Sequence, residues 1–383
     1  MRAMKYLSLI AESLLVLTVA ACSGAGTPPS APASQAPASA GASQPAPQPG
    51  AAAPAAVAAP ASDQPLSPPV KVTWGVSALA PEAGIFVAKE KGYFEQEGLD
   101  VELTTFTRFA DQLPLLATGK LDYGTGGINP EIFNAISRDI PVRIVTANAV
   151  GTPGDRSAAL LVRQDLVDSG RFKALEDLRG MKIAINSPGT SSQLILERIL
   201  AKGGLTRDDV DLTIVPFSET ATALANAGID AAFTVEPFIN GIVARGLARS
   251  IITGTEGFPG SINQIVVISP VFAKEQPEAA KRLMYAFLKG QREYLAAFIT
   301  GTNPGARDEI IQILTRYTAL KDPALYAGMG MSGGDPNGAV DLRVLAEMQD
   351  YFVKDGTLQQ ALDVTQVVDP SYAEYAAQRL GKM

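Results

Sequence analysis

The residue types that most often carry covalent catalysis are nearly absent from this sequence. Its 383 residues include one cysteine, Cys22, and no histidine. Ser-His-Asp and Cys-His catalysis are therefore excluded, as are zinc sites built from cysteine and histidine. A disulfide within the chain is excluded too, and we expect neither a metal nor a cofactor. Carboxylate chemistry remains open, so composition alone does not exclude an enzyme.

The segment before Cys22 has the features of an export signal. Arg2 and Lys5 make a basic start, and the uncharged run 13–21 is too short to cross a bilayer, which needs ~20 apolar residues. This pattern, ending in small residues, is typical of a secretory signal peptide. In one interpretation the peptide is cut after Ala21, and Cys22 lies at the new terminus by accident.

A second interpretation gives Cys22 a role. The residues VAAC at 19–22 resemble the lipobox of bacterial lipoproteins, in which the cysteine sulfur receives a diacylglycerol and becomes the mature N-terminus. The resemblance implies a signal peptide at 1–21 and a protein anchored to the cell membrane through lipidated Cys22, facing the outside or the periplasm. Residues 22–70 are nearly all Ala, Pro, Ser, Gly and Gln, which predicts an extended tether.

The rest of the chain, residues 71–383, alternates between strand and helix patterns. The expected strands are 71–76, 99–105, 121–125, 141–150, 157–163, 180–187, 211–217, 229–235 and 262–270. The alternation predicts an α/β fold with largely parallel sheets. Irregular stretches at 151–156 and 254–261 predict two crossovers, which divide the chain into lobe 1 (71–152 plus 262–383) and lobe 2 (153–261). A formal charge of -7 argues against a nucleic-acid partner.

Candidate ligand contacts follow the expected strands, because ligands of α/β sheets bind beyond the carboxyl ends of the strands. The candidates are Ser77, Glu82, Phe106, Arg108, Phe109, Asn129, Asn186, Thr190, Ser191, Ser192, Phe217, Glu236 and Phe238. Several of these have a structural alternative. Glu236, Asn129 and the Thr190–Ser191 pair are also suited to capping helices. Arg108 is also suited to lying exposed at a helix start.

Five stretches resemble the substrate-binding proteins of ABC importers for thiamine precursors, aliphatic sulfonates, taurine and nitrate. In chain order they are AKEKGYFEQEGLDVEL (88–103), LLATGKLDYGTGG (115–127), VEPF (235–238), DPNGAVDLRVLAEMQDYFVKDG (335–356) and VVDPSYAEYAAQRLG (367–381). The resemblance implies the bilobal periplasmic-binding-protein fold of type II, closing on a small molecule in a cleft between two α/β lobes. It also implies a monomer that delivers this molecule to a membrane permease driven by a separate ATPase chain.

The candidate residues favour a flat nitrogen heterocycle as the ligand. Aromatic faces suit flat rings, and carboxylates accept hydrogen bonds from ring N–H or amino groups. Riboflavin and the thiamine pyrimidine are ligands of relatives in this broad family. We favour riboflavin, because the four candidate phenylalanines could sandwich a large ring. The alternative is an aliphatic sulfonate, taurine or nitrate.

Two rival classes remain. A pyrimidine synthase of thiamine biosynthesis shares the fold that the resemblance implies, but that enzyme consumes an active-site histidine and carries a cysteine-rich motif, and this sequence has neither. We therefore expect a protein that is not an enzyme. A structural surface lipoprotein would have no cleft that closes on a ligand.

Overall fold

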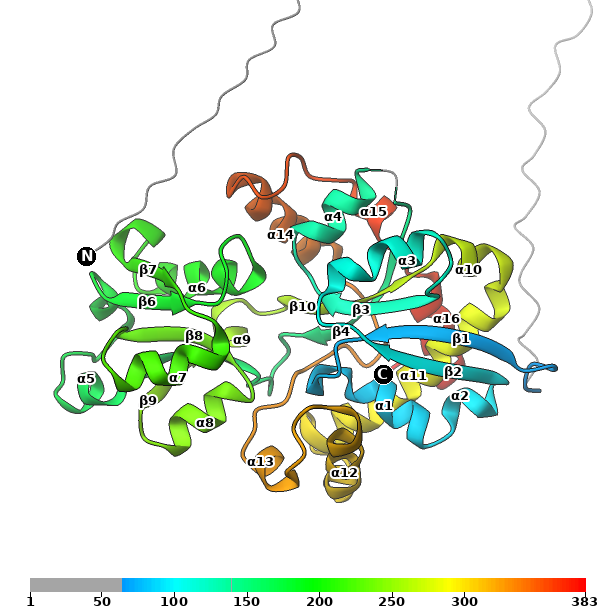
Figure 1. Ribbon diagram of the computed structural model, residues 1–383, viewed down its shortest axis with the longest axis horizontal. Coiled ribbons are helices and arrows are strands. Elements are labelled where there is room, and N and C mark those ends of the chain that lie inside the picture. The colour runs from blue at the N-terminus through cyan, green and yellow to red at the C-terminus, as the bar shows by residue number, and fades with distance from the viewer. Residues whose placement is uncertain (1–63, 139) are drawn as a thin grey trace, which may run out of the picture. The chain divides into compact units, whose positions relative to one another are not determined.

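The computed structural model describes residues 64–138 and 140–383, which contain two five-stranded sheets (Figure 1). The first sheet has the order β2-β1-β3-β10-β4. Its strands are β1 (Val70–Val76), β2 (Leu99–Thr105), β3 (Tyr123–Gly127), β4 (Arg143–Val150) and β10 (Ile262–Ile268). The second sheet has the order β7-β6-β8-β5-β9. Its strands are β5 (Ala158–Arg163), β6 (Lys182–Ile185), β7 (Asp211–Ile214), β8 (Ala231–Val235) and β9 (Ala248–Thr253).

Each sheet contains one strand that runs against its neighbours. In the first sheet this strand is β10, which is antiparallel to β3 and β4, whereas β1 is parallel to β2 and β3. In the second sheet it is β5, which is antiparallel to β8 and β9. Both are strands that the chain enters directly after crossing from the other sheet. The expected parallel sheets are therefore mixed sheets, and the two sheets share one topology.

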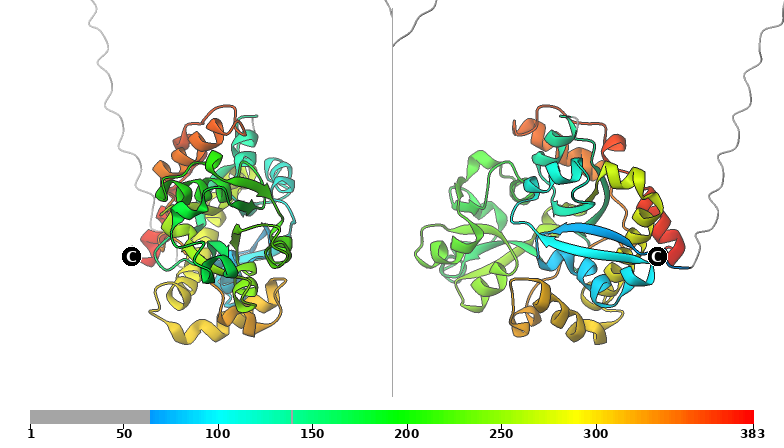
Figure 2. Two further views of the ribbon diagram at one scale, coloured as in Figure 1. Left: turned by 90° about the vertical axis from the view of Figure 1, so that its left-hand side faces the viewer. Right: turned by 45° about the vertical axis from the view of Figure 1, so that its right-hand side comes forward.

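The helices lie on both faces of the two sheets, as the further views in Figure 2 also show. Those before the second crossover are α1 (Ala83–Glu90), α2 (Tyr93–Gln96), α3 (Leu113–Ala117), α4 (Pro130–Ile136), α5 (Gln164–Asp168), α6 (Ser191–Lys202), α7 (Phe217–Ala225), α8 (Phe238–Ala244) and α9 (Gly254–Gly257). Those after it are α10 (Pro270–Glu275), α11 (Pro277–Phe298), α12 (Arg307–Tyr317), α13 (Pro323–Ala327), α14 (Leu342–Lys354), α15 (Val364–Val367) and α16 (Ser371–Leu380). Within the described residues no helix is long and apolar enough to span a membrane.

The core of the first sheet is built around Trp74 on β1, which is fully buried. Its ring packs against Tyr123 of β3 at 5.2 Å and Phe287 of α11 at 5.8 Å between centroids. The indole N–H donates to Thr125 Oγ1 over 2.8 Å, so the buried polar atom is satisfied. Helices α1, α2, α11, α12 and α16 supply many of the other buried side chains of this cluster, and the strands of the sheet supply most of the rest.

Strand β9 was not expected from the sequence. Arg249 and Ser250 are exposed, and β9 lies at the edge of its sheet, so the segment lacks the apolar pattern of a buried strand. The other expected strands of 71–383 are present, with shifts of a few residues at their ends. Cys22 and residues 1–63 lie outside the described part, so the signal peptide, the lipidation and most of the tether remain predictions.

Helix α14 contacts both halves of the molecule, although we expected residues 262–383 to belong to lobe 1. On one side Phe352 of α14 packs against Phe133 of α4, with centroids 6.2 Å apart. On the other side α14 contacts α6, where the Tyr351 hydroxyl donates to Glu197 Oε1 over 2.9 Å. Beyond the helix, Asp355 pairs with Arg207 at 3.1 Å. Figure 1 shows α14 in orange beside α4.

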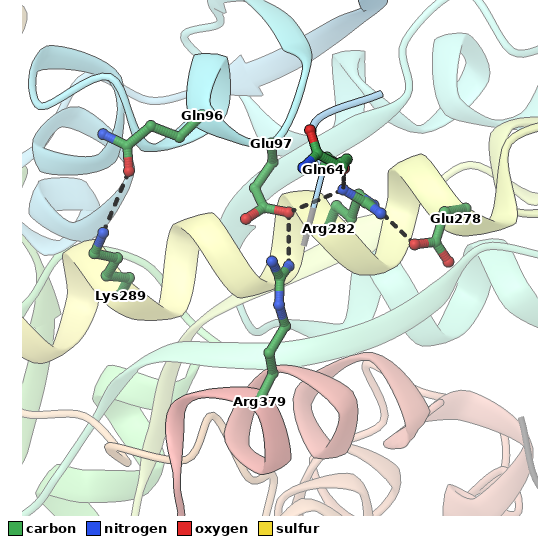
Figure 3. Close-up of polar contacts among 7 residues, drawn as sticks. All are labelled: Gln64, Gln96, Glu97, Glu278, Arg282, Lys289 and Arg379. Carbon is green, nitrogen blue, oxygen red and sulfur yellow. Dashed lines mark hydrogen bonds and ion pairs between the residues drawn. The ribbon is translucent and has the colours of Figure 1, made fainter. Parts of the chain in front are cut away.

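The first described residues are bound to the domain by a buried charge cluster, shown in Figure 3. The Glu97 carboxylate accepts hydrogen bonds from Arg379 of α16 at 2.6 Å and from Arg282 of α11 at 3.5 Å. Arg282 also donates to the Gln64 carbonyl over 2.6 Å. The backbone of Leu66 lies so close to Gly98 that a Cβ at Gly98 would overlap it, and Gly98 also has a left-handed φ of +75°. These contacts hold the backbone of Gln64 and Leu66 against the domain.

Replacing Glu97 with glutamine should destabilise the protein. Arg282 is only 3% exposed, and the change leaves two guanidinium groups around a neutral amide. We expect the free energy of unfolding in urea to fall by about 3 kcal/mol, as for other broken buried ion pairs. The matched control is Glu95→Gln, since Glu95 is largely exposed and pairs only with Lys89 in the described structure; it should cost less than about 1 kcal/mol. Equal losses in the two variants would contradict a structural role for the cluster.

Candidate ligand-binding site

A pocket of about 330 Å³ lies between the two sheets. Its walls come from both sheets and from the segment 318–332. The lining residues are Ser77–Pro81, Gly127, Ala149, Ser157, Ala158, Ser191, Ser192, Ile195, Phe233, Val235–Pro237, Asn263, Gln264, Thr318–Leu320, Tyr326, Met329, Gly330 and Ser332. The volume is in the range of sites for small organic molecules.

The topology explains why these segments meet. The loop after β1, the end of β3 and the end of β8 reach the pocket with their carboxyl ends. The antiparallel strands β5 and β10 reach it with their amino ends, because an antiparallel strand begins where its neighbours end. This places Ser157 and Ala158 at the start of β5, and Asn263 and Gln264 at the start of β10, in the pocket wall.

Most of the pocket wall is apolar. Phe233 and Val235 are two residues apart on β8 and therefore share a face of the strand. Leu320, Tyr326 and Met329 come from the C-terminal segment. The Tyr326 hydroxyl is hydrogen-bonded with Thr318 Oγ1 at 2.5 Å and donates to the Leu320 carbonyl over 3.2 Å, so the phenol is anchored. Such a wall suits a ligand with an apolar or aromatic middle.

The start of α6 forms a polar end of the pocket. Thr190 is the N-cap residue but makes no side-chain cap bond, and its Oγ1 donates to the Ser187 carbonyl over 3.1 Å. The first N–H groups of a helix have no partner within the helix. Ser191 and Ser192 therefore present hydroxyls and backbone donors to the pocket, a combination suited to a ligand oxygen.

Glu236 also lines the pocket, but both of its carboxylate oxygens already accept hydrogen bonds. Oε1 accepts from Gly330 N–H at 2.8 Å, and Oε2 accepts from Asn240 N–H at 3.0 Å. Burial raises the pKa of Glu236, while these two backbone donors oppose the shift. The carboxylate thus joins β8 to the start of α8 and to the C-terminal segment, in addition to facing the pocket.

Glu82 does not line the pocket; it is fully buried and supports the loop that does. Its Oε1 accepts from Ser77 N–H at 2.7 Å and its Oε2 from Leu79 N–H at 3.0 Å. Desolvation raises its pKa from 4.5 to about 7, despite the opposing effect of these hydrogen bonds. Asp155 holds Ser157 in a similar way, accepting from its N–H and hydroxyl at 2.8 and 2.7 Å.

Of the thirteen candidate contacts, Ser77, Ser191, Ser192 and Glu236 line the pocket. Those that follow the edge strands β2 and β7 do not, because both strands lie at the outer side of their sheets. After β2, Arg108 is exposed, Phe106 packs on the core and Phe109 is buried against Gly126. After β7, Phe217 packs against Phe238 of α8, with ring centroids 6.0 Å apart.

Two of the three remaining candidates have local structural roles. Asn129 caps α4 by accepting from Glu131 N–H at 3.0 Å, and Thr190 occupies the N-cap of α6. Asn186 lies at the end of β6, where its Oδ1 is buried and has no hydrogen-bond partner among the described residues. None of these three residues lines the pocket.

Sequence reasoning missed Phe233, Gln264 and Tyr326 as pocket residues. Phe233 lies within an expected strand, not after it. Gln264 follows the second crossover, and only the antiparallel direction of β10 shows that its first residues face the pocket. Tyr326 comes from a segment with no strand in the described structure, so the rule about strand ends gave no signal for it.

Two sheets of this topology with a pocket between them define the bilobal periplasmic-binding-protein fold of type II, and the predicted fold class is confirmed. The family model described as NMT1/THI5 like matches residues 81–297. A protein named as a binding protein in Brucella abortus is 31% identical over 309 residues, 76% of this chain and 85% of the relative. The chain therefore belongs to the NMT1/THI5-like family and is a solute-binding protein of the ABC-importer type.

Other similar proteins have more specific names. The formylaminopyrimidine-binding protein of Halalkalibacterium halodurans is 29% identical over 156 residues, 41% of this chain and 43% of the relative. The structure of the periplasmic aliphatic sulphonate binding protein SsuA from Escherichia coli matches with a TM-score of 0.62 at 19% identity, over 79% of this chain and 92% of that one. The structure of the desulfurization enzyme DSZB matches with a TM-score of 0.55 at 17% identity, and the match covers 81% of this chain and 99% of that one. The fold alone does not separate binding proteins from enzymes.

The raised pKa of Glu82 predicts how stability depends on pH. Between pH 4.5 and pH 7 the carboxyl group ionises in the unfolded chain while the folded protein still holds its proton. The free energy of unfolding should therefore fall as pH rises through this range. In Glu82→Gln this contribution is absent. We expect the wild type to lose about 3 kcal/mol relative to the variant across the range, measured by urea denaturation. A difference that does not change with pH would show that Glu82 is ionised in the folded protein.

Proposed function

We propose that this protein captures a small, flat nitrogen heterocycle of the thiamine-pyrimidine type. The observation that carries the proposal is the chemistry of the pocket wall. It combines the aromatic rings of Phe233 and Tyr326 with the carboxamides of Asn263 and Gln264 and the carboxylate of Glu236, and no lysine or arginine is among its lining residues. Rings with amino groups and ring nitrogens complement such a wall, because they both donate and accept hydrogen bonds.

Riboflavin becomes the second choice. The preference for riboflavin depended on a sandwich of Phe106, Phe109, Phe217 and Phe238, and none of these four lines the pocket. The hydroxyls of Ser191 and Ser192 remain suitable partners for a ribityl chain. The name of the Halalkalibacterium halodurans relative supports the smaller ring.

An aliphatic sulfonate, taurine or nitrate is the alternative, and the similarity to the sulphonate binding protein supports it equally. The specific observation in its favour is the start of α6, where unpaired backbone N–H groups suit an oxyanion. A full negative charge would also lie in the same pocket as Glu236, and no cationic side chain lines the wall, although the positive charge of Arg156 outside the wall acts on Glu236. Repulsion between like charges at low dielectric disfavours that arrangement.

The proposal includes the cellular setting that the sequence predicts. The protein is tethered to the outer face of the cell membrane by lipidated Cys22 and acts as a monomer. It binds its ligand without converting it and passes it to a permease driven by a separate ATPase. Ser77, Ser191, Ser192 and Glu236 are the ligand contacts retained from the sequence-based set, because they line the pocket.

A thermal-shift titration tests the ligand class. At about 100-fold excess over Kd, formylaminopyrimidine should stabilise the protein by about 2.7 kcal/mol and raise Tm by several degrees. The ligand should be recovered unchanged after denaturation. Phe233→Leu should weaken binding about 10-fold, or ~1.4 kcal/mol, whereas Phe238→Leu is the matched control outside the pocket. Stabilisation by riboflavin and not by formylaminopyrimidine would favour riboflavin as the ligand. Stabilisation only by alkanesulfonate or nitrate would overturn the heterocycle proposal.

Membrane anchoring is tested by Cys22→Ser. Without the sulfur no diacylglycerol can be attached, so the protein should move from the membrane fraction to the soluble fraction of the envelope or the medium. Incorporation of labelled palmitate should be lost at the same time. Ser23→Ala, which leaves the cysteine in place, is the control. Lipidation would be contradicted if Cys22→Ser stayed in the membrane fraction and the wild type took up no labelled palmitate.

A further inference from the structure

A buried asparagine fixes the orientation of one pocket-lining side chain. Asn148 on β4 is fully buried and does not line the pocket. Its Nδ2 donates to the Pro81 carbonyl over 3.1 Å and to Gln264 Oε1 over 2.5 Å. Both hydrogens of this amide group are therefore used, one on the loop after β1 and one on the pocket residue.

The Pro81 carbonyl determines which atoms of Asn148 and Gln264 face each other. The Pro81 oxygen can only accept a hydrogen bond, so the nitrogen of Asn148 must face it. The reverse orientation would place Asn148 Oδ1 against that carbonyl. With the nitrogen fixed, Gln264 must turn its oxygen toward Asn148 and its nitrogen away from it. Pro81, Asn148 and Gln264 thus form a one-directional amide chain that ends at the pocket.

The free end of the chain is a hydrogen-bond donor. Gln264 is 6% exposed, and its residual exposure is to the pocket that it lines. Its Nε2 donates to no residue in the described part of the chain, and it is not one of the enclosed polar atoms without a partner. A ligand that fills the pocket therefore meets N–H at this point and not a carbonyl oxygen.

We propose that Gln264 is a specificity-determining residue that donates from Nε2 to an acceptor atom of the ligand, and that Asn148 is the positioning residue that sets this polarity. The inference rests on the proposed function and deepens it. It requires the ligand to carry a carbonyl oxygen on the side of the first sheet, which in formylaminopyrimidine is the formyl oxygen. A ligand with an N–H or ammonium group there would leave two donors facing each other in a dry site.

The requirement separates closely related molecules. Formylaminopyrimidine carries a formyl oxygen and ring nitrogens, all acceptors. Its deformylated amine replaces the formyl group with an ammonium that can only donate. We expect the wild type to bind the formyl compound at least about 10-fold more tightly than the amine. The reason is that leaving a buried donor without a partner costs about 1–3 kcal/mol.

Asn148→Asp tests the polarity without altering the pocket wall. When ionised, the introduced carboxylate can only accept, so Gln264 should turn its nitrogen toward it and present Oε1 to the ligand. Because burial favours the protonated carboxyl, which can donate, binding is compared at low and high pH, and the effect should be complete only at high pH. Binding of formylaminopyrimidine, measured by calorimetry, should weaken at least about 10-fold, and the preference over the amine should shrink or reverse. Gln264→Glu should act in the same direction if Asn148→Asp does not fold, because one carboxylate oxygen can accept from Asn148 while the other faces the ligand. Asn226→Asp, an exposed change of the same charge, is the control.

A second measurement needs no ligand. In the wild type, proton exchange at the Gln264 side-chain amide should be fast and at the Asn148 amide slow, as read by NMR. In Asn148→Asp the Gln264 amide should become protected. If the wild type binds neither pyrimidine but shows this exchange pattern, the proposed ligand class fails while the amide chain stands. If the wild type binds the formyl compound and both variants bind it equally well, or if the Gln264 amide is already protected, the role of Gln264 is overturned.

Discussion

The site depends on one topological constraint: the chain enters each new sheet as an antiparallel strand. Because β10 runs against β3 and β4, its amino end lies at the edge where β1 and β3 have their carboxyl ends. The same holds for β5 beside β8. The two crossovers therefore bring the beginnings of β5 and β10 into the pocket between the sheets. Gln264 lines the pocket for this reason and would lie at the opposite end of a parallel strand.

A second feature of the site is that its loops are held by buried polar groups and not by the ligand. Glu82 binds the backbone of Ser77 and Leu79, Asp155 binds Ser157, and Asn148 binds Pro81. Each of these groups loses solvation on folding, and the hydrogen bonds that it accepts or donates offset part of that loss, although Asn148 Oδ1 and Asp155 Oδ2 have no partner in the described structure. The raised pKa of Glu82 means that desolvation outweighs the hydrogen bonds for its ionised form. The benefit is a wall already ordered before binding, which lowers the entropy cost of capturing a small molecule.

The sequence was sufficient for the elements and only partly sufficient for the site. Alternating and helical patterns predicted nearly all strands, because burial on one or both faces determines them; β9 escaped because Arg249 and Ser250 are exposed at a sheet edge. Ser77, Ser191, Ser192 and Glu236 reach the pocket because they follow inner strands. Phe109 and Phe217 follow edge strands, and strand order, a long-range property, cannot be derived from local periodicity. For the same reason the direction of β10, and with it Gln264, could not be predicted.

The C-terminal segment links the pocket to the rest of the molecule. Tyr326, Met329 and Ser332 belong to the wall, and the segment is held from both sides. Glu236 accepts from Gly330 N–H and Asn240 Nδ2 donates to the Leu325 carbonyl on the second sheet's side, while the Tyr294 hydroxyl donates to the Ser332 carbonyl on the first sheet's side. Helix α14 then contacts α4 and α6, which belong to different sheets. A relative movement of the sheets must therefore break or carry along contacts at both places. A ligand in this pocket that contacts Tyr326 or Met329 would add to the interactions that hold the segment in place.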